Sequence, residues 1–382
     1  MAKLYVGVNN IARKVSKVYV GVNGVARKVK TIYVGVGGTA RKAYIGALPT
    51  LKQYSGSLYV GYNKNSGGGA SIKTNLYGVF AGGFYYTSGQ GQKAYGDVRA
   101  FDANLTYTDL DSFSTGVSNI GSASISKYAI FQGGKDSVNN IISTVHAYDN
   151  SLTHITISGL QRARQNAGSA SNAYFAIFAG GFTTNQIGSI CGLVDYYNTA
   201  LSRSTADAMG SKVDMGCASF KDTSVSFFVA GRYSNTSMVN TVDVYNTMVK
   251  SSLSSVGTAR GYLKGTDIGN YCIFGGGATI SSNRQVASDV VDIFDKNYTR
   301  STSTLYTATT NNVGAGSTDS YAIFFHTGGF TLFDEYLTKT KGLSSTYAWI
   351  TESYCHAGKY ILRGVGSRGG AYTNMVEAFY EE

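Results

Sequence analysis

Histidine and cysteine are the side chains best suited to metal or nucleophilic chemistry, and this 382-residue chain has only four of each. His326 and His356, together with Cys355 and the many tyrosines, offer nitrogen, sulfur and oxygen donors of the kind that copper binds. The cysteines are too widely spaced for a disulfide scaffold or a paired CxxC zinc site, so free thiols are expected. Copper chemistry is the one metal-dependent alternative; otherwise we expect no metal and no cofactor.

A second set of residues suits ligand binding rather than catalysis. Segments such as FYYTSGQGQKAYG at 84–96 and RYSNTSMVN at 232–240 combine Tyr, Asn, Gln, Ser, Gly and Arg. Tyrosine rings stack on pyranose faces, and amides and guanidinium groups bond hydroxyls, although the same residues are also ordinary loop formers. The candidate binding residues are Tyr85, Tyr86, Arg232, Tyr233, Asn283, Arg284, Arg368 and Tyr372.

Common catalytic motifs are absent from the sequence. It has no Walker loop, no HExxH motif and no GxSxG in a strand-to-helix context. The run GGG at 275–277 ends an apolar segment, as other glycine pairs in this chain do, so it is not a phosphate loop. We therefore predict a non-enzymatic protein, with copper oxidase-like or glycan-cleaving activity as the enzymatic alternatives.

Composition and charge separate a basic head from a nearly neutral body. The chain is rich in Gly and aromatic residues and only 14% charged, which favours an all-β protein. Residues 1–53 hold ten Lys and Arg and no acidic residue, whereas the rest has 23 basic and 22 acidic residues. No apolar run reaches 18 residues and no secretory apolar segment begins the chain, so we expect no membrane insertion.

The basic head is a tandem repeat with a period of 14 residues: KLYVGVNNIARKVS at 3–16, KVYVGVNGVARKVK at 17–30 and TIYVGVGGTARKAY at 31–44. Each copy places a two-residue turn of the type that tolerates positive φ between two β-prone runs, which predicts three hairpins. Pairing across the first turn sets Val8 opposite Ile11, Val6 opposite Arg13 and Tyr5 opposite Lys14. Such a module has no second layer of its own, so we expect it to dock on a partner.

This tandem repeat resembles short YVGVNGVARKV-type modules of bacteriophage virion proteins, particularly tail and baseplate components. The resemblance covers residues 3–44 and implies attachment to a virion or phage-tail-like particle. The attachment residues implied are Tyr5, Arg13, Tyr19, Arg27, Tyr33 and Arg41. Pro49, the only proline, marks the end of the repeat; we predict a hairpin module at 1–48, a linker at 49–54 and a second domain at 55–382.

A longer repeat of about 47 residues governs the second domain. Apolar runs ending in glycine recur seven times, from GVFAGG at 78–83 to YILRGVG at 360–366, and we align them on Phe80, Phe131, Phe178, Val229, Phe274, Phe324 and Leu362. A strand such as TVHAYD at 144–149 follows most of these runs, and one such as GSASI at 121–125 precedes them. Four short strands per repeat is the content of a propeller blade.

The pattern resembles kelch-type β-propellers, in which a diglycine after an apolar strand is followed by an aromatic residue in the next strand. Ala163-Arg164 and Ala259-Arg260 resemble a kelch inter-blade turn, whereas the repeated Trp of kelch blades is missing. We predict seven blades, with the run at 55–62 completing the last one. Six blades plus an irregular tail is the alternative.

Alignment of the repeats gives the candidate chemical residues ordinary structural roles. Cys272 and Cys217 occupy small strand positions, and His146 stands where other repeats have Arg, Asp or Glu. Some kelch-like propellers are copper radical oxidases with two His, two Tyr and a Tyr-Cys crosslink at the centre, which is the basis of the copper alternative. The S-x-D-x-G-x-T-W boxes of sialidase propellers are absent.

Together these features predict a non-enzymatic bacteriophage virion protein of the tail-fibre or baseplate type, made in the bacterial cytoplasm and located in the virion. Residues 1–48 would bind other virion proteins, and the propeller loops would bind a host-surface glycan or protein, in several copies per particle. The alternative is a decoration protein of the phage head, neck or baseplate whose propeller binds other virion subunits. We expect no nucleic-acid partner.

Overall fold

The computed structural model describes residues 5–8, 11–14, 19–22, 25–28, 32–36, 39–43, 49–64, 67–72, 76–87, 91–310, 313–343, 349–350, 353–364, 366–368 and 371–382. The chain forms two compact units, one of residues 1–50 with Glu382 and one of Leu51–Glu381. Within the described residues, the single helical segment is the three-residue turn η1 (Ile187–Ser189), and no helix is long and apolar enough to cross a membrane.

The first unit contains three separate two-stranded hairpins. Their strands are β1 (Tyr5–Val8), β2 (Ile11–Lys14), β3 (Tyr19–Val22), β4 (Val25–Lys28), β5 (Ile32–Val36) and β6 (Thr39–Ala43). The register pairs Val8 with Ile11 and Val6 with Arg13, as the repeat predicted. The side chains of residues 1–48 and the predicted turn residues lie outside the described residues, so the attachment role of Tyr5, Arg13, Tyr19, Arg27, Tyr33 and Arg41 stays a prediction.

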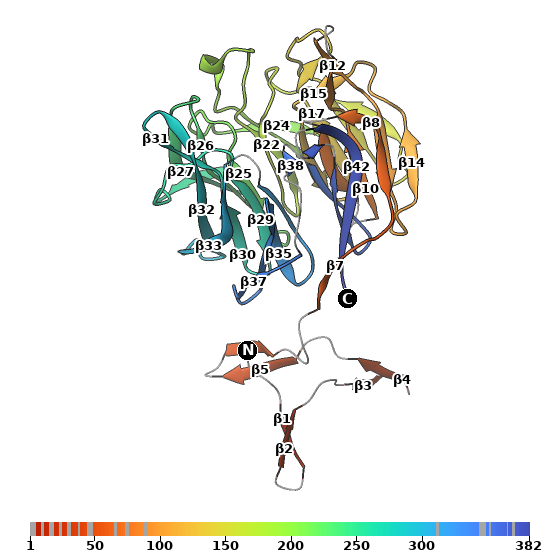
Figure 1. Cartoon of the computed structure of the whole chain (residues 1–382), viewed down its shortest axis with the longest axis vertical. Coiled ribbons are helices and arrows are strands. Elements are labelled where there is room, and N and C mark those ends of the chain that lie inside the picture. Colours follow the sequence, from red (N-terminus) through yellow and green to blue (C-terminus); the bar gives the residue numbers. More distant parts are fainter. Residues whose placement is uncertain are drawn as a thin grey trace. The chain divides into compact units, whose positions relative to one another are not determined.

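The second unit is a seven-bladed β-propeller, which confirms the predicted fold class. Figure 1 shows its sheets, with β12 and β31 at one end of the unit and β37 at the other. Blade 1 contains, from innermost to outermost strand, β9 (Gly68–Ile72), β10 (Tyr77–Ala81), β13 (Val98–Phe101) and β14 (Tyr107–Leu110). In the same order, blade 2 contains β16 (Gly121–Ile125), β17 (Tyr128–Gln132), β19 (Val145–Tyr148) and β20 (His154–Ile157). Blade 3 contains β21 (Gly168–Ser171), β22 (Phe175–Ala179), β23 (Val194–Asn198) and β24 (Arg203–Ala206).

Blades 4 to 6 have the same antiparallel order. Blade 4 contains β25 (Gly216–Ser219), β26 (Val225–Arg232), β27 (Met238–Asn246) and β28 (Val249–Leu253). Blade 5 contains β29 (Lys264–Ile268), β30 (Tyr271–Gly275), β32 (Arg284–Asp295) and β33 (Arg300–Thr309). Blade 6 contains β34 (Gly314–Ser317), β35 (Tyr321–His326), β36 (Gly329–Asp334) and β37 (Lys339–Lys341). Blade 6 is therefore a complete four-stranded sheet despite its short repeat, which rules out the six-bladed alternative.

Blade 7 closes the ring by pairing the two ends of the propeller sequence. It contains β39 (Ser353–Ala357), β40 (Tyr360–Gly364) and β42 (Ala371–Glu381), and its outer strand comes from β7 (Leu51–Gln53) and β8 (Leu58–Lys64). Closure through residues 55–62 was predicted. The prediction of a linker at 49–54 is wrong in part, because residues 51–53 form strand β7 of the propeller.

Short ribbons extend several blades beyond the four-stranded sheets. β11 (Phe84–Thr87) pairs with β12 (Gly91–Ala94), and β31 (Ala278–Ser281) pairs with β32. The remaining short strands are β15 (Val117–Ser118), β18 (Lys135–Asp136), β38 (Trp349–Ile350) and β41 (Ser367–Arg368). All of these ribbons involve a loop between the second and third strands of a blade, so they lie at the same end of the propeller.

Aromatic residues fill the space between neighbouring blades. Tyr148, Tyr197 and Tyr245 on the third strands are fully buried. Each hydroxyl donates to a carbonyl just beyond the fourth strand of the preceding blade, at Asp111, Ser158 and Asp207, over 2.5 to 2.7 Å. Since a buried hydroxyl needs a partner, these bonds fix the blades relative to one another. The repeat alignment needs one correction: Phe228 rather than Val229 matches Phe178, because Phe228 pairs with Cys217 as Phe178 pairs with Ser169.

Buried ion triplets hold blades 3, 4 and 5 together. In each, an aspartate on the third strand contacts one cation from the loop preceding the blade and another from the fourth strand. The sets are Arg164–Asp195–Arg203, Lys212–Asp243–Lys250 and Arg260–Asp292–Arg300. Arg164 also donates to the carbonyl of Phe178 at 3.0 Å, and Lys212 to that of Phe228 at 2.9 Å. The kelch-like turn residues thus act as inter-blade ties.

Breaking one of these triplets should destabilise the propeller strongly. The Asp292→Asn variant leaves the fully buried Arg260 without a compensating charge, so we expect the free energy of unfolding to fall by about 3–5 kcal/mol. The matched control is Asp109→Asn, which breaks the Arg99 pair of blade 1 at a carboxylate that is 66% exposed, with an expected loss below about 1 kcal/mol. Chemical denaturation measures both, and equal losses would contradict the assignment.

Candidate functional site

Inter-blade loops build a collar at the centre of the propeller. Asn119, Asn166, Asp214 and Tyr262 each lie two residues before an inner strand and have φ between 50° and 63°. Asn and Asp tolerate this left-handed conformation better than most residues. The Asn166 amide donates to the carbonyl of Asn119 at 3.0 Å, and that of Tyr262 to the carbonyl of Asp214 at 2.7 Å. The collar therefore joins consecutive blades through the backbone.

The inner strands are joined by serine side chains. Ser122 Oγ donates to the carbonyl of Gly69 at 2.9 Å, and Ser124 and Ser171 accept from the amides of Ser71 and Ser124 at 2.7 and 2.8 Å. Ser353 Oγ donates to the carbonyl of Gly67 at 2.7 Å across the closure. The recurring G-S-A-S pattern thus reflects hydrogen bonds that link neighbouring inner strands from β39 through β9 and β16 to β21. The sequence shows this signal as a repeat without showing the bonding partners.

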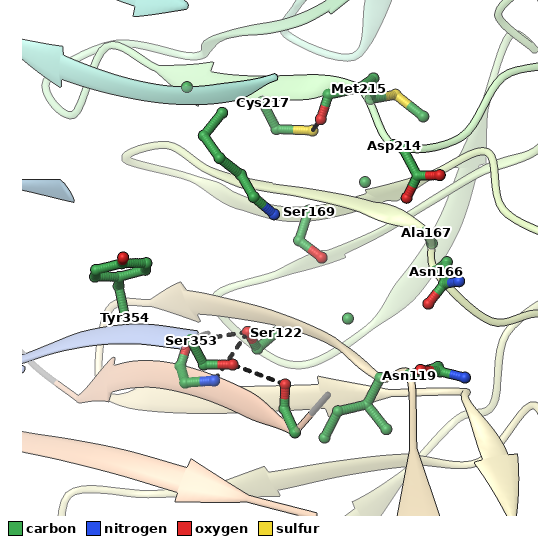
Figure 2. A pocket seen from close by; sticks show the side chains of 17 residues that line it. Asn119, Ser122, Asn166, Ala167, Ser169, Asp214, Met215, Cys217, Ser353 and Tyr354 are labelled. Carbon is green, nitrogen blue, oxygen red and sulfur yellow. Dashed lines mark hydrogen bonds between the residues drawn. The ribbon is translucent and has the colours of Figure 1, made fainter. Parts of the chain in front are cut away.

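Collar and inner strands enclose a cavity of about 370 Å³. Its lining comes from six inner strands at their starting ends (β9, β16, β21, β25, β29 and β39) and from the collar, including Asn119, Ser122, Asn166, Ser169 and Asp214. Figure 2 shows Asn119, Asn166 and Asp214 on one side of it and Tyr354 on the opposite side. Because inner strands begin where second strands end, the cavity lies at the same end as the loops between second and third strands.

Glycine lets the inner strands around this cavity pack closely against one another. A Cβ on Gly265 would lie 2.5 Å from the carbonyl oxygen of Cys217, and one on Gly69 would lie 2.8 Å from that of Tyr354. Both are closer than a real Cβ contact. The inner strands therefore need glycine at these positions in order to pack around the axis.

Asp214 on the cavity wall is neutralised by Arg232. The Arg232 Nε lies 2.5 Å from the Asp214 carboxylate, and its Nη1 donates to Asn235 at 2.6 Å. The guanidinium also stacks near the rings of Phe182 and Tyr262, with its carbon 5.4 and 5.1 Å from their centroids. Since Arg232 is only 8% exposed, the structure makes it a residue that positions the loop rather than the direct ligand contact expected from the sequence.

Lys264 supplies the other charge of the cavity. It is exposed and stands at the start of β29, and its side chain forms no ion pair or hydrogen bond with the residues that the structure describes. Its neighbour Cys217 is a neutral thiol, because burial raises the cysteine pKa to about 12 against the opposing effect of Lys264 and Lys212. Cys217 is therefore not an activated nucleophile.

None of the sequence-predicted binding residues whose side chains the structure describes lines this cavity. Tyr233 is 57% exposed beyond Arg232, and Tyr85 lies half-buried in β11. Asn283 has φ of 60° in the turn between β31 and β32, where it acts as a turn former, and Arg284 is exposed beside it. The side chains of Tyr86, Arg368 and Tyr372 lie outside the described residues.

Histidines and cysteines are dispersed, which gives no support to the copper alternative. Among the described residues, no three His, Cys, Asp or Glu side chains form a group that could hold a metal. His326 Nε2 bonds Thr331 Oγ1 at 2.9 Å, and His356 Nε2 bonds the carbonyl of Ser317 at 2.6 Å. Cys355 and Cys272 are buried in the core.

Comparison with known proteins places the fold only. Neither a family model nor a curated protein matches the chain. The solved structure of YjhT matches with a TM-score of 0.53 and 13% sequence identity, over 83% of this chain and 95% of that chain. The two proteins share the β-propeller fold. At this identity the likeness carries no information on ligand or role, so the virion location, the partners and the absence of catalysis stay predictions.

His146 makes the propeller sensitive to acid. It stacks on Phe113 with ring centroids 4.1 Å apart and bonds His154 at 2.9 Å, and burial followed by the His154 charge lowers its pKa from 6.5 to about 4. Below about pH 6.5 the imidazole of His146 therefore binds a proton in the unfolded chain, whereas in the folded protein it stays neutral down to about pH 4. The free energy of unfolding therefore falls as the pH drops from about 6.5 to about 4.

We expect the His146→Phe variant to lose less of its thermal stability than the wild-type protein between pH 7 and pH 4.5. Thermal unfolding at several pH values measures the difference. Burial also lowers the pKa values of His326 and His356, so part of the acid sensitivity should persist in the variant. Identical pH profiles of the two proteins would show that His146 does not contribute.

Proposed function

We propose that this protein is a non-enzymatic component of a phage or phage-tail-like particle that binds a host-surface glycan with the loop end of its propeller. The hairpin repeats of residues 1–48 attach it to the particle. The observation that carries the binding half is the polar cavity at the loop end, because hydroxyl, amide and ammonium groups converge there on a space of about 370 Å³. This volume suits a small ligand or the end of a larger one.

The chemistry of the cavity supports binding rather than catalysis. The Asp214 carboxylate is paired with Arg232, and the Cys217 thiol is held neutral. The Ser122 hydroxyl is engaged by the carbonyl of Gly69. No described residue of the cavity combines a nucleophile with an adjacent base, as covalent catalysis requires. Hydroxyl groups on the inner strands and amide groups on the collar are instead suited to recognising sugar hydroxyls.

The hairpin module supports the attachment half of the proposal. Three hairpins of the same sequence pattern each form their own small sheet, and none of them belongs to the propeller sheets. A two-stranded hairpin is marginally stable alone, so a partner surface would stabilise it. The ten basic residues and the absence of acidic ones in residues 1–53 favour an acidic partner surface.

Glycan binding can be tested with the full-length protein and the fragment 49–382 on a panel of bacterial surface polysaccharides at physiological salt. We expect saturable binding by both. Tyr233→Ala, at the loop end, should weaken binding at least about fivefold, since exposed aromatic contacts are often worth more than 1 kcal/mol.

The matched control is Tyr174→Ala. Tyr174 is 54% exposed, against 57% for Tyr233, but lies in the turn between β21 and β22 at the opposite end of the propeller. Its loss should leave glycan binding unchanged. If neither protein form binds any polysaccharide while residues 1–48 still associate with particle components, the decoration-protein alternative replaces the host-binding proposal.

A further inference from the structure

We infer that the central cavity recognises an acidic sugar residue, whose carboxylate pairs with Lys264. This inference rests on the proposed function and names the class of glycan. Six inner strands and the collar shape the cavity, so the site belongs to the centre of the propeller and not to the exposed loops that the sequence singled out.

The charge of the cavity favours an anion. Two ionised side chains line it, Lys264 and Asp214. The Asp214 carboxylate is already neutralised by Arg232 at 2.5 Å, whereas Lys264 has no ion-pair partner among the described residues. A bound carboxylate would complete the pairing of Lys264. A neutral sugar would leave this ammonium group with water alone.

The remaining polar groups favour a sugar over a simple anion. Ser169 Oγ and the Asn166 side chain line the cavity and make no hydrogen bond to any described residue. Asn166 offers both a donor and an acceptor, and a serine hydroxyl offers the same, which matches the paired donor and acceptor character of sugar hydroxyls. Figure 2 shows Ser169 between the Asn166 side and the Tyr354 side of the cavity.

A single ammonium favours a carboxylate over a phosphate. Phosphate sites commonly use Arg forks or several backbone amides at a helix N-terminus, to match two negative charges and several acceptor oxygens. The described part of the propeller has no helix beyond the three-residue turn η1, and the one guanidinium near the cavity is engaged by Asp214. One lysine beside hydroxyl and amide groups suits a uronic-acid type of ligand.

The test compares an acidic polysaccharide containing glucuronate with the same polymer after its carboxyl groups are reduced to alcohols. We expect the full-length protein to bind the acidic form at least tenfold more tightly, with an affinity that falls as salt rises. Lys264→Gln should remove the preference and Lys264→Arg should retain it. Lys127→Gln is the control, because it changes net charge equally in the turn between β16 and β17, at the opposite end.

The outcomes separate this inference from the proposed function. Equal affinity for the acidic and reduced polymers, or a preference that survives in Lys264→Gln, would overturn the acidic-sugar assignment while leaving glycan binding intact. Tighter binding of a phosphate-bearing polysaccharide than of the glucuronate polymer would overturn the carboxylate assignment. Failure to bind any polysaccharide would overturn the proposed function, and this inference with it. Unchanged melting temperatures would show that each variant is folded.

Discussion

This propeller depends on each blade being held in one position against the next. In blades 3 to 5, buried ion triplets hold the blade in that position. Arg164, Lys212 and Arg260 leave the loops before these blades and reach an aspartate inside the blade that follows. A buried charge is tolerated only when it is paired, so each triplet requires one relative position of loop, third strand and fourth strand. Blade 2 meets the same need with different chemistry, because Phe113 from the loop before it stacks on His146.

Because ion pairs and buried aromatic residues hold the third and fourth strands in place, the inner strands can consist mainly of small residues. Their serines bond across blades and their glycines allow close approach of neighbouring backbones, so a polar space remains at the axis. The cavity is thus a consequence of ring closure by β7 and β8 and of the composition of the inner strands. A site built on strands is more rigid than one built on loops, which lowers the entropic cost of ordering it around a ligand.

The two ends of the propeller differ in how their charged side chains are paired, and this difference favours the loop end as the binding end. At the loop end, Lys264 is unpaired and neutral polar groups surround it. At the opposite end, Lys221 contacts Ser317 at 2.9 Å and lies 3.5 Å from Asp267, and Glu381 accepts hydrogen bonds from Ser320. The charges of Lys221 and Glu381 are thus met by neighbouring side chains, so these two groups offer less to a ligand than Lys264 does.

The repeats could be identified from the sequence alone, and they predicted the register of the first hairpin, the seven blades, the closing strand at 55–62 and an aromatic residue in the third strand. These follow from local periodicity, because each copy of a repeat must form the same strands. The residues that line the central cavity, and their pairing, became apparent only from the tertiary structure. Arg232 and Asp214, 18 residues apart, neutralise each other, and Lys264 joins Asn166 and Ser169 only when the ring closes. Pairing between distant residues depends on how blades pack around the axis, and no local pattern specifies it.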